Sequence, residues 1–158
     1  MVESAALEMR YTRNGIRGSN PLVSAIKIYN MENNYCLFCD KDNKKEHKII
    51  LENDFAYARW DNFPVSKGHL EIVPKPHINS LFDLNSEELI QIYSLLNDVK
   101  KIIQKDYNPD GYNIGINEGE AAGRTVHHLH IHLIPRYKGD IENPHGGVRN
   151  IIPGKGQY

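Results

Sequence analysis

The sequence predicts an α+β domain in which an antiparallel sheet of about five strands packs against one main helix. Short apolar-rich runs follow one another across tight turns, and sequential strands that are joined in this way pair antiparallel. One long stretch instead repeats its apolar residues at steps of three and four, which is the period of a helix with one buried face.

The expected strands are short and end at residues that favour turns. Glu52-Asn53-Asp54 separates the first two strands as a hairpin-like turn, and Pro74 closes the third. We expect strands at His47–Leu51, Phe55–Trp60, His69–Val73, Tyr112–Ile116 and Val126–Ile134.

The expected helix, Asn85–Lys105, carries its own start and stop signals. Asn85 can cap the first turn with Glu88 three residues later, a variant of the capping box. The turn-forming run 107–111 ends the helix. Its apolar stripe is expected at Leu89, Ile92, Leu96, Val99 and Ile103.

At 158 residues the chain is long enough for one domain with a sizeable core. Residues 1–30 have weak periodicity, and we expect a flexible extension or a segment foreign to the domain. A short helix around Val2–Met9 that docks on the body is the alternative. Residues 31–158 then form the domain.

The bulk charge and hydropathy exclude some partners. A formal net charge of −1 argues against a nucleic-acid partner that is bound by bulk electrostatics. No stretch approaches the roughly 20 apolar residues that span a bilayer, and no secretory signal is recognisable. We therefore expect no membrane partner and a cytoplasmic location.

Within residues 126–135, three histidines alternate with large aliphatic residues. On a strand the histidines would line one face, and the aliphatic residues would point into the core. The histidines are His128, His130 and His132. The aliphatic residues are Leu129, Ile131 and Leu133. Imidazoles in such a row can bind a metal, attack phosphorus or pass protons near neutral pH.

Two uses of these histidines compete. A metal site made of all three normally has a carboxylate or a further histidine close in sequence, and here no acid follows until Asp140. We therefore favour nucleophilic use. Separately, Cys36 and Cys39 form half of a zinc site, or a redox pair that lacks the surrounding strand and helix of a thioredoxin.

These motifs resemble the histidine triad family of nucleotide hydrolases and transferases, over about residues 35–158. The resemblance implies a half-barrel sheet, a nucleotide-binding catalytic domain and a homodimer that pairs through the long helix and the Tyr112–Ile116 strand. The matching segments are Cys36–Cys39, Phe63–Leu70, Ile72–His77, Gly119–Gly123, His128–Ile134 and Pro135-Arg136.

The resemblance places the nucleophile on the middle histidine, His130. Its imidazole would attack the α-phosphorus, and water would later cleave the nucleotidyl-histidine. His132 would bind phosphate oxygens or protonate the leaving group. His128 completes the catalytic triad. Developing charge would be met by Thr125 and by backbone N–H groups of the turn that begins at Gly123.

Three further residues fall on substrate-binding positions of the family. Asp61 is expected to bind ribose hydroxyls, or else only to turn the chain after a strand. Asn117 is expected on the phosphate side, or as a turn residue. Arg124 stands where the family often has glutamine, and it would either pair with a polyphosphate or point to solvent.

The family also implies that His77 and His128 join the two cysteines in a closed Cys₂His₂ site for one structural zinc per chain. His47 and His69 are expected to be surface or strand residues, and His127 is given no role. In the loop-like C-terminal segment, Arg149 and Lys155 are either polyphosphate contacts or solvated cations.

The resulting hypothesis is a nucleoside phosphate hydrolase that acts on AMP-containing substrates, either dinucleoside polyphosphates or nucleoside phosphoramidates. Alternatives are a nucleotidyltransferase or phosphorylase of the same family, and a nucleotide-binding regulatory module with incidental turnover. A three-histidine metalloenzyme would instead lose activity with a chelator.

Overall fold

The computed structural model describes residues 36–40 and 47–156, and the extension expected at residues 1–30 lies outside this part. The strands are β1 (Ile49–Glu52), β2 (Ala56–Trp60), β3 (Leu70–Pro74), β4 (Gly111–Gly115) and β5 (Ile131–Arg136). The long helix is α3 (Ser86–Tyr107). Short 3₁₀ turns are η1 (Leu81–Asp83), η2 (Glu120–Ala122) and η3 (Gly147–Ile151).

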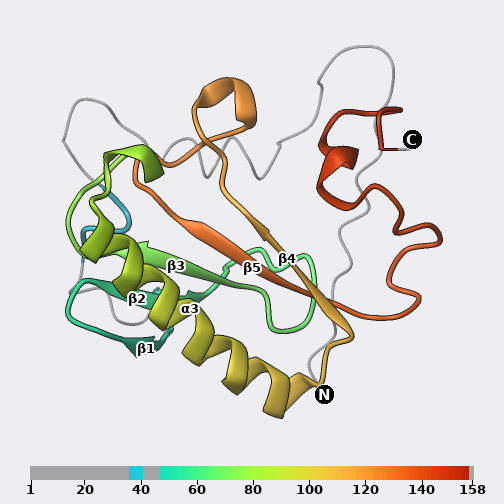
Figure 1. Ribbon diagram of the computed structural model, residues 1–158, viewed down its shortest axis with the longest axis horizontal. Helices are drawn as coiled ribbons and strands as arrows, with labels where there is room; N and C mark the ends of the chain where they lie inside the picture. Colours follow the sequence, from blue (N-terminus) through green and yellow to red (C-terminus); the bar gives the residue numbers. More distant parts are fainter. Residues whose placement is uncertain (1–35, 41–46, 157–158) are drawn as a thin grey trace.

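The five strands form one antiparallel sheet in the order β1-β2-β3-β5-β4 (Figure 1). The helix α3 connects β3 to β4, and β5 returns between these two strands. The expected fold class is therefore confirmed. Because β5 comes last in the sequence but lies between β3 and β4 in the sheet, residues from three distant parts of the chain meet along β3 and β5.

The capping of α3 is as expected. The Asn85 side chain accepts hydrogen bonds from the N–H groups of Glu87 and Glu88, and the Glu88 carboxylate accepts from the Asn85 N–H. The helix ends where Asn108 adopts a left-handed conformation with φ 46°. Among the described residues, no helix combines the length and the apolar character needed to cross a membrane.

The expected apolar stripe of α3 is partly wrong. Leu89 is 41% exposed, and Leu95, which was not expected in the stripe, is buried, whereas Leu96 is only partly buried. Leu95 and Leu96 lie three and four positions after Ile92, so the sequence period alone does not say which of them faces the sheet. The buried residues are Ile92, Leu95, Val99 and Ile103.

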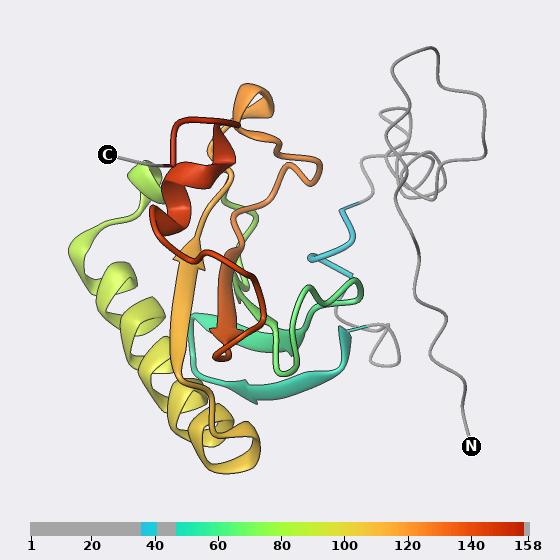
Figure 2. The ribbon, with the colours of Figure 1, turned by 90° about the vertical axis from the view of Figure 1, so that its right-hand side faces the viewer.

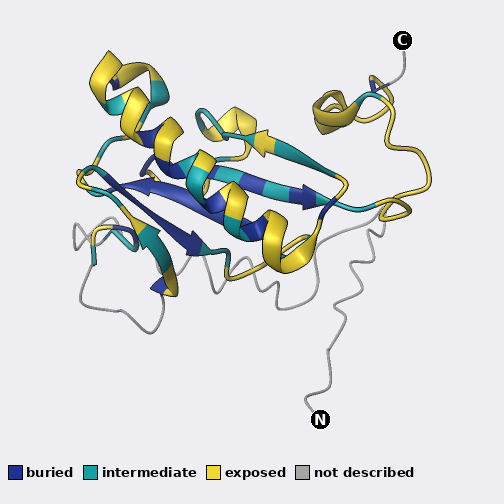
Figure 3. Ribbon diagram, turned by 60° about the horizontal axis from the view of Figure 1, so that its bottom comes forward, coloured by how far each residue is buried: buried dark blue, intermediate teal, exposed yellow. Residues whose placement is uncertain are grey.

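Two apolar clusters lie on opposite faces of the sheet. The larger one lies between α3 and the sheet and includes Leu129, Ile131 and Leu133, which confirms that these aliphatic residues enter the core. The smaller one joins Phe38 to Tyr57 and Val73. Figure 2 shows α3 on one side of the sheet and residues 36–40 on the other. In Figure 3, β2 and β3 are buried along most of their length, while α3 exposes its outer face.

The fifth strand begins later than expected, at Ile131, so that only His132 of the three histidines lies within it. The β3–β5 pairing ends at Ile72 and Ile131 because the backbone groups beyond this pair form hydrogen bonds with other partners. The Pro74 carbonyl binds the His128 side chain. The N–H of Leu129 donates to the Ile78 carbonyl. The first two histidines therefore sit in a loop that enters β5.

Candidate functional site

A backbone carbonyl fixes the tautomer of His130, and no described residue forms a hydrogen bond with its Nε2. Its Nδ1 lies 2.8 Å from the His128 carbonyl oxygen, which can only accept, so Nδ1 carries a proton and, in the neutral ring, Nε2 keeps its lone pair. Burial lowers the pKa of His130, and the charges of His132 and Arg124 lower it further against the opposing effect of the His128 carbonyl. This is the state that a nucleophilic imidazole needs.

Both ring nitrogens of His128 are engaged by protein groups. Its Nε2 lies 2.9 Å from the Pro74 carbonyl oxygen and therefore carries the proton. Its Nδ1 lies 3.3 Å from Cys36 Sγ and 3.5 Å from Cys39 Sγ. Burial lowers the pKa of His128 to about 4. The side chain therefore faces the cysteines, and His128 reaches His130 through its carbonyl oxygen.

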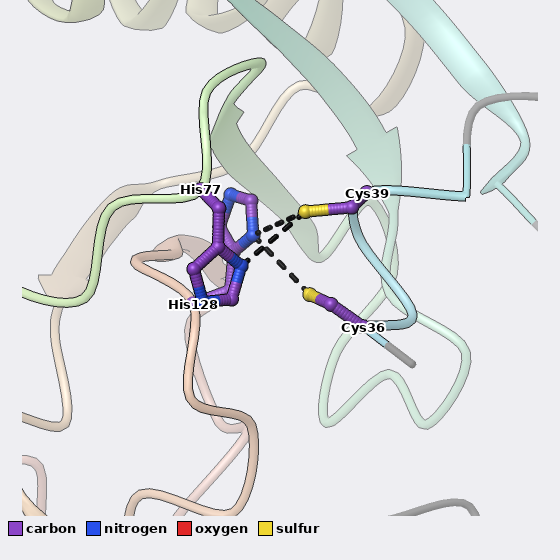
Figure 4. Close-up of side chains that lie close together, drawn as sticks. All are labelled: Cys36, Cys39, His77 and His128. Atoms are coloured by element: carbon purple, nitrogen blue, oxygen red, sulfur yellow. Dashed lines mark hydrogen bonds between the residues drawn. The ribbon is translucent and has the colours of Figure 1, made fainter. Parts of the chain in front are cut away.

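Cys36, Cys39, His77 and His128 form one cluster (Figure 4). Cys39 Sγ lies 3.3 Å from His77 Nδ1, and all four candidate ligand atoms lie within 4.8 Å of one another. The Pro74 carbonyl leaves the Nδ1 lone pair of His128 directed at the sulfur atoms, and within the described residues neither cysteine is part of a disulfide. Two thiolates and two imidazoles are a donor set that zinc prefers. The residues therefore fit a metal ion.

His132 belongs to a second group of polar side chains. Its Nδ1 lies 3.0 Å from His69 Nε2 and 3.6 Å from Asp61 Oδ2, and the same carboxylate oxygen lies 3.4 Å from His69 Nε2. The N–H of Val65 donates to His69 Nδ1, so His69 presents its own proton at Nε2. His69 was expected to be a surface or strand residue; it is buried directly before β3, and its contact with His132 was not predicted.

The charges around His132 favour its protonated form. Burial alone would lower the pKa of His132, but a hydrogen bond to Asp61 and the charges of Glu71 and Asp61 raise it above its ordinary value. Burial would raise the pKa of Asp61, and bonds from His132 and from the Phe63 N–H lower it. The rings of His130 and His132 lie 5.2 Å apart, so a neutral and a readily protonated imidazole stand side by side.

Two buried charged residues, Glu71 and Arg59, continue this group of polar side chains from His132 across the sheet. Neither was predicted from the sequence. Arg59 is 2% exposed and Glu71 is 7% exposed. Arg59 Nη1 lies 3.5 Å from Glu71 Oε2, and Glu71 Oε1 lies 4.0 Å from His132 Nδ1. The available signal was a charged residue inside each of two predicted strands, Arg59 in Phe55–Trp60 and Glu71 in His69–Val73. It was not used, because such residues more often face solvent.

Arg124 is held by the protein on the side of the site where η2 lies. Its Nη2 donates to Glu118 Oε1 at 2.6 Å, and its Nε donates to the Asn117 carbonyl oxygen at 3.0 Å. The side chain is 9% exposed, so it does not point to solvent. Gly123 adopts φ 89° at the end of η2, and the neighbouring Thr125 is exposed. Arg124 is therefore held in place by an ion pair with Glu118, and its charge acts on His130, whose pKa it lowers.

Phe38 lies between the Cys36, Cys39, His77 and His128 cluster and His130. Its ring lies 5.6 Å from that of His128 and 5.3 Å from that of His130, and the Arg59 guanidinium lies 5.3 Å from its centroid. Unlike Phe38, Phe63 is 73% exposed. In the C-terminal segment, Arg149 donates hydrogen bonds to the Lys155 carbonyl oxygen. The turn between the two cysteines thus forms one wall of the site.

The chain belongs to the HIT domain family, whose model matches residues 42–139. It is 38% identical over 120 residues to an uncharacterised HIT-like protein of Methanocaldococcus jannaschii, a match that covers 73% of this chain and 91% of that protein. It is 32% identical to the bis(5'-adenosyl)-triphosphatase of Dictyostelium discoideum, over 63% of this chain and 66% of that protein. It is 31% identical to the AP-4-A phosphorylase of Mycobacterium tuberculosis, over 61% and 50% respectively.

Solved structures of the family share the fold. A HIT family protein from Bacillus anthracis superposes with a TM-score of 0.63 at 36% identity, over 68% of this chain and 77% of that one. A zinc-bound histidine triad family protein from Mycobacterium smegmatis superposes with a TM-score of 0.59 at 29% identity, over 68% and 79%. The domain is thus of a nucleotide-processing family.

Proposed function

We propose that the protein is a nucleoside phosphate hydrolase that cleaves AMP-containing substrates at the α-phosphate through a nucleotidyl-histidine intermediate on His130. The observation that carries this proposal is the 2.8 Å contact between His130 Nδ1 and the His128 carbonyl. It fixes the tautomer that leaves Nε2 unprotonated. Neutral imidazole is a nucleophile for phosphorus, and the resulting phosphoramidate is reactive enough for water to cleave.

In the first step, a bond forms between His130 Nε2 and the α-phosphorus while the bond to the leaving group breaks. His132 gives its proton to the leaving oxygen or nitrogen. In the second step, water attacks the phosphorus and its proton passes to His132, so that His130 departs as neutral imidazole. The raised pKa of His132 and the lowered pKa of His130 support this division of roles.

On the substrate side, Asp61 would bind the ribose diol, because a carboxylate can accept two hydrogen bonds. Asn117, Gly123 and Thr125 would line the α-phosphate. Arg124 would supply positive charge near the bond that breaks, and its contacts with Glu118 and the Asn117 carbonyl would hold it there. The nucleotide half must be fixed first, because His130 has to lie about 3–3.5 Å from the phosphorus that it attacks.

We also propose that Cys36, Cys39, His77 and His128 hold one structural zinc ion per chain. A closed set of four protein ligands leaves no position for substrate, which is the pattern of structural zinc sites. Bound zinc would tie the residue 36–40 turn to His128. The need for two reduced cysteines suits a cytoplasmic location. The zinc-bound relative from Mycobacterium smegmatis supports the choice of metal.

Incubation with diadenosine polyphosphates and with an adenosine phosphoramidate, followed by chromatography of the products, tests the proposal. A hydrolase of this kind releases AMP from every substrate. The relative named AP-4-A phosphorylase supports a second candidate, in which phosphate replaces water. Formation of ADP from diadenosine tetraphosphate only when inorganic phosphate is added would select that alternative. Tight nucleotide binding without turnover would instead select a regulatory module.

A further inference from the structure

A row of charged side chains crosses the middle of the sheet. In the strand register, Arg59 of β2 lies opposite Glu71 of β3, and Glu71 lies opposite His132 of β5. Directly opposed residues project to the same face, so the three side chains stand next to one another. Within β4, the residue opposite His132 is Gly115, where an added Cβ would meet no atom within 4 Å. The row therefore ends at an open position beside His132.

Glu71 is fixed from two sides. Its Oε2 faces Arg59 Nη1 at 3.5 Å, and its Oε1 faces His132 Nδ1 at 4.0 Å. Arg59 is itself held, because its Nε donates to the His47 carbonyl at 3.3 Å and its guanidinium lies over the Phe38 ring. Burying a carboxylate and a guanidinium costs desolvation energy that an apolar pair would avoid. If Glu71 served only as the counter-ion of Arg59, the position of its second carboxylate oxygen, which faces His132, would have no explanation.

We propose that Glu71 is a positioning residue for His132. In its ionised form, the buried carboxylate of Glu71 stabilises the protonated His132 imidazole that gives its proton to the leaving group. Arg59 holds the carboxylate in place. This inference rests on the proposed function. No proton passes to or from Glu71. As the bond from phosphorus to the leaving group breaks, the proton moves from His132 to the departing atom, and His132 becomes neutral.

Glu71 differs from Asp61, the other carboxylate near His132. Asp61 is the residue proposed to bind ribose, so that a bound substrate would compete with His132 for its oxygens. The Glu71 side chain is 10% exposed and lies between two neighbouring strands. It therefore keeps its place behind His132 when substrate is bound.

Among the described residues, four titratable groups face His132. They are Asp61 after β2, His69 just before β3, Glu71 of β3, and His130 of its own segment. His69 presents an N–H, which can turn from His132 Nδ1 to Asp61 Oδ2 when His132 gains a proton. Removing the charge of Glu71 therefore removes one of two carboxylates that favour the imidazolium, without breaking a hydrogen bond to the ring.

Titration of His132 by nuclear magnetic resonance, on the metal-loaded protein without substrate, tests the inference independently of turnover. Glu71→Gln should lower the pKa of His132 by about one pH unit or more, since an opposite charge within about 4–6 Å typically shifts a pKa by that amount. Glu71→Asp, which keeps the charge, should restore most of the difference. Ile72→Val, on the opposite face of the same strand, is the matched control and should leave the titration unchanged. An unaltered His132 titration in Glu71→Gln overturns the inference.

Kinetics provide the second measurement. In Glu71→Gln, kcat should fall about tenfold or more for an adenosine phosphoramidate with an alkylamine leaving group, with KM nearly unchanged. It should fall much less for a p-nitrophenyl ester of AMP, whose leaving group needs no proton. Equal losses on both substrates would assign Glu71 a merely structural role. If neither substrate turns over in the wild-type protein, the proposed function fails, and the titration alone decides the role of Glu71.

Discussion

The imidazole of His130 donates its Nδ1 proton to the carbonyl oxygen of His128, 2.8 Å away in the same segment. The bond needs no second strand or loop, because both groups belong to the short stretch that enters β5. In the neutral ring this leaves the lone pair on Nε2. The three alternating histidines thus contact different groups: His128 contacts the cysteines, His130 the His128 carbonyl, and His132 the carboxylates.

His130→Ala and His130→Gly should abolish turnover, because removing a nucleophile typically lowers the rate by about 10⁴-fold or more. Nucleotide binding and the fold should persist, since the ring is replaced by a smaller group at one position. Steady-state kinetics and isothermal titration with AMP measure the two effects. His127→Ala is the matched control, because His127 lies in the same segment, is exposed and has no assigned role. A His130→Ala protein with a tenth of normal activity would rule out covalent catalysis.

Cys36→Ser should reduce the metal content from about one zinc per chain and lower the melting temperature. The loss of stability should exceed the loss of specific activity in the folded fraction, because the proposed zinc ion does not touch substrate. Elemental analysis and calorimetry measure both quantities. Full metal content together with an unchanged melting temperature would show that the cluster was assigned wrongly.

Asp61 should be coupled to the ribose hydroxyls. Removing the substrate 2'-hydroxyl should lower kcat/KM for the wild-type protein, by about tenfold for a lost hydrogen bond to a charged group. In Asp61→Ala the same substrate change should have little further effect, because the acceptor is already gone. This double-mutant cycle separates ribose binding from the contact between Asp61 and His132, which both substrates share. Additive losses would mean that Asp61 acts only through the histidines.

The raised pKa of Glu71 should make the free energy of unfolding depend on pH. Burial raises its pKa from 4.5 to about 7, with Asp61 adding to the rise and Arg59 and His132 opposing it. The folded state therefore binds the proton more tightly than the unfolded state, and the stability that this provides is present below pH 4.5 and lost as the pH rises toward 7. Chemical denaturation should show Glu71→Gln gaining stability relative to wild type over this window. A constant difference between the two proteins from pH 4 to about pH 8 would contradict the shift.

We expect a homodimer, because β4 is an edge strand and because α3 has apolar residues on its outer face. Ile114 of β4 is 51% exposed, and Ile90 and Tyr93 of α3 are 65% and 69% exposed. Ile90→Glu should shift the protein toward the monomer in sedimentation experiments at micromolar concentration. Ile151→Glu, on an exposed residue of η3, is the control. A wild-type protein that sediments as a monomer would remove this expectation.

The sequence was sufficient where a feature depends on neighbouring residues. The capping box of Asn85 and Glu88 and the alternation of Leu129, Ile131 and Leu133 with the histidines are local patterns, and both are present. Features that depend on strand register were not accessible. Glu71 meets Arg59 and His132 only because β2, β3 and β5 pair in one particular alignment, which no local period specifies.

The start of β5 is a second feature that the local sequence pattern did not predict. Alternation from Val126 onward is typical of a strand, but residues 126–130 are not part of a strand and β5 begins only at Ile131. The ladder with β3 ends where the Pro74 carbonyl accepts a hydrogen bond from the His128 side chain instead of from a backbone N–H. A side chain that competes for a backbone acceptor cannot be identified from apolar periodicity. It is this competition that aims His128 at the cysteines.

The central claim is that His130 becomes covalently attached to the nucleotide, and rapid quenching followed by mass spectrometry tests it most directly. The wild-type protein is mixed with an adenosine phosphoramidate, quenched at alkaline pH to preserve the phosphoramidate bond, and digested. The expected result is one adenylyl group on the peptide that contains His130. This adduct should be absent from His130→Gly. Its occupancy should rise under conditions that slow the attack of water on the nucleotidyl-histidine. Rapid substrate consumption with no adenylylated peptide, or an adduct that maps to His132, would contradict it.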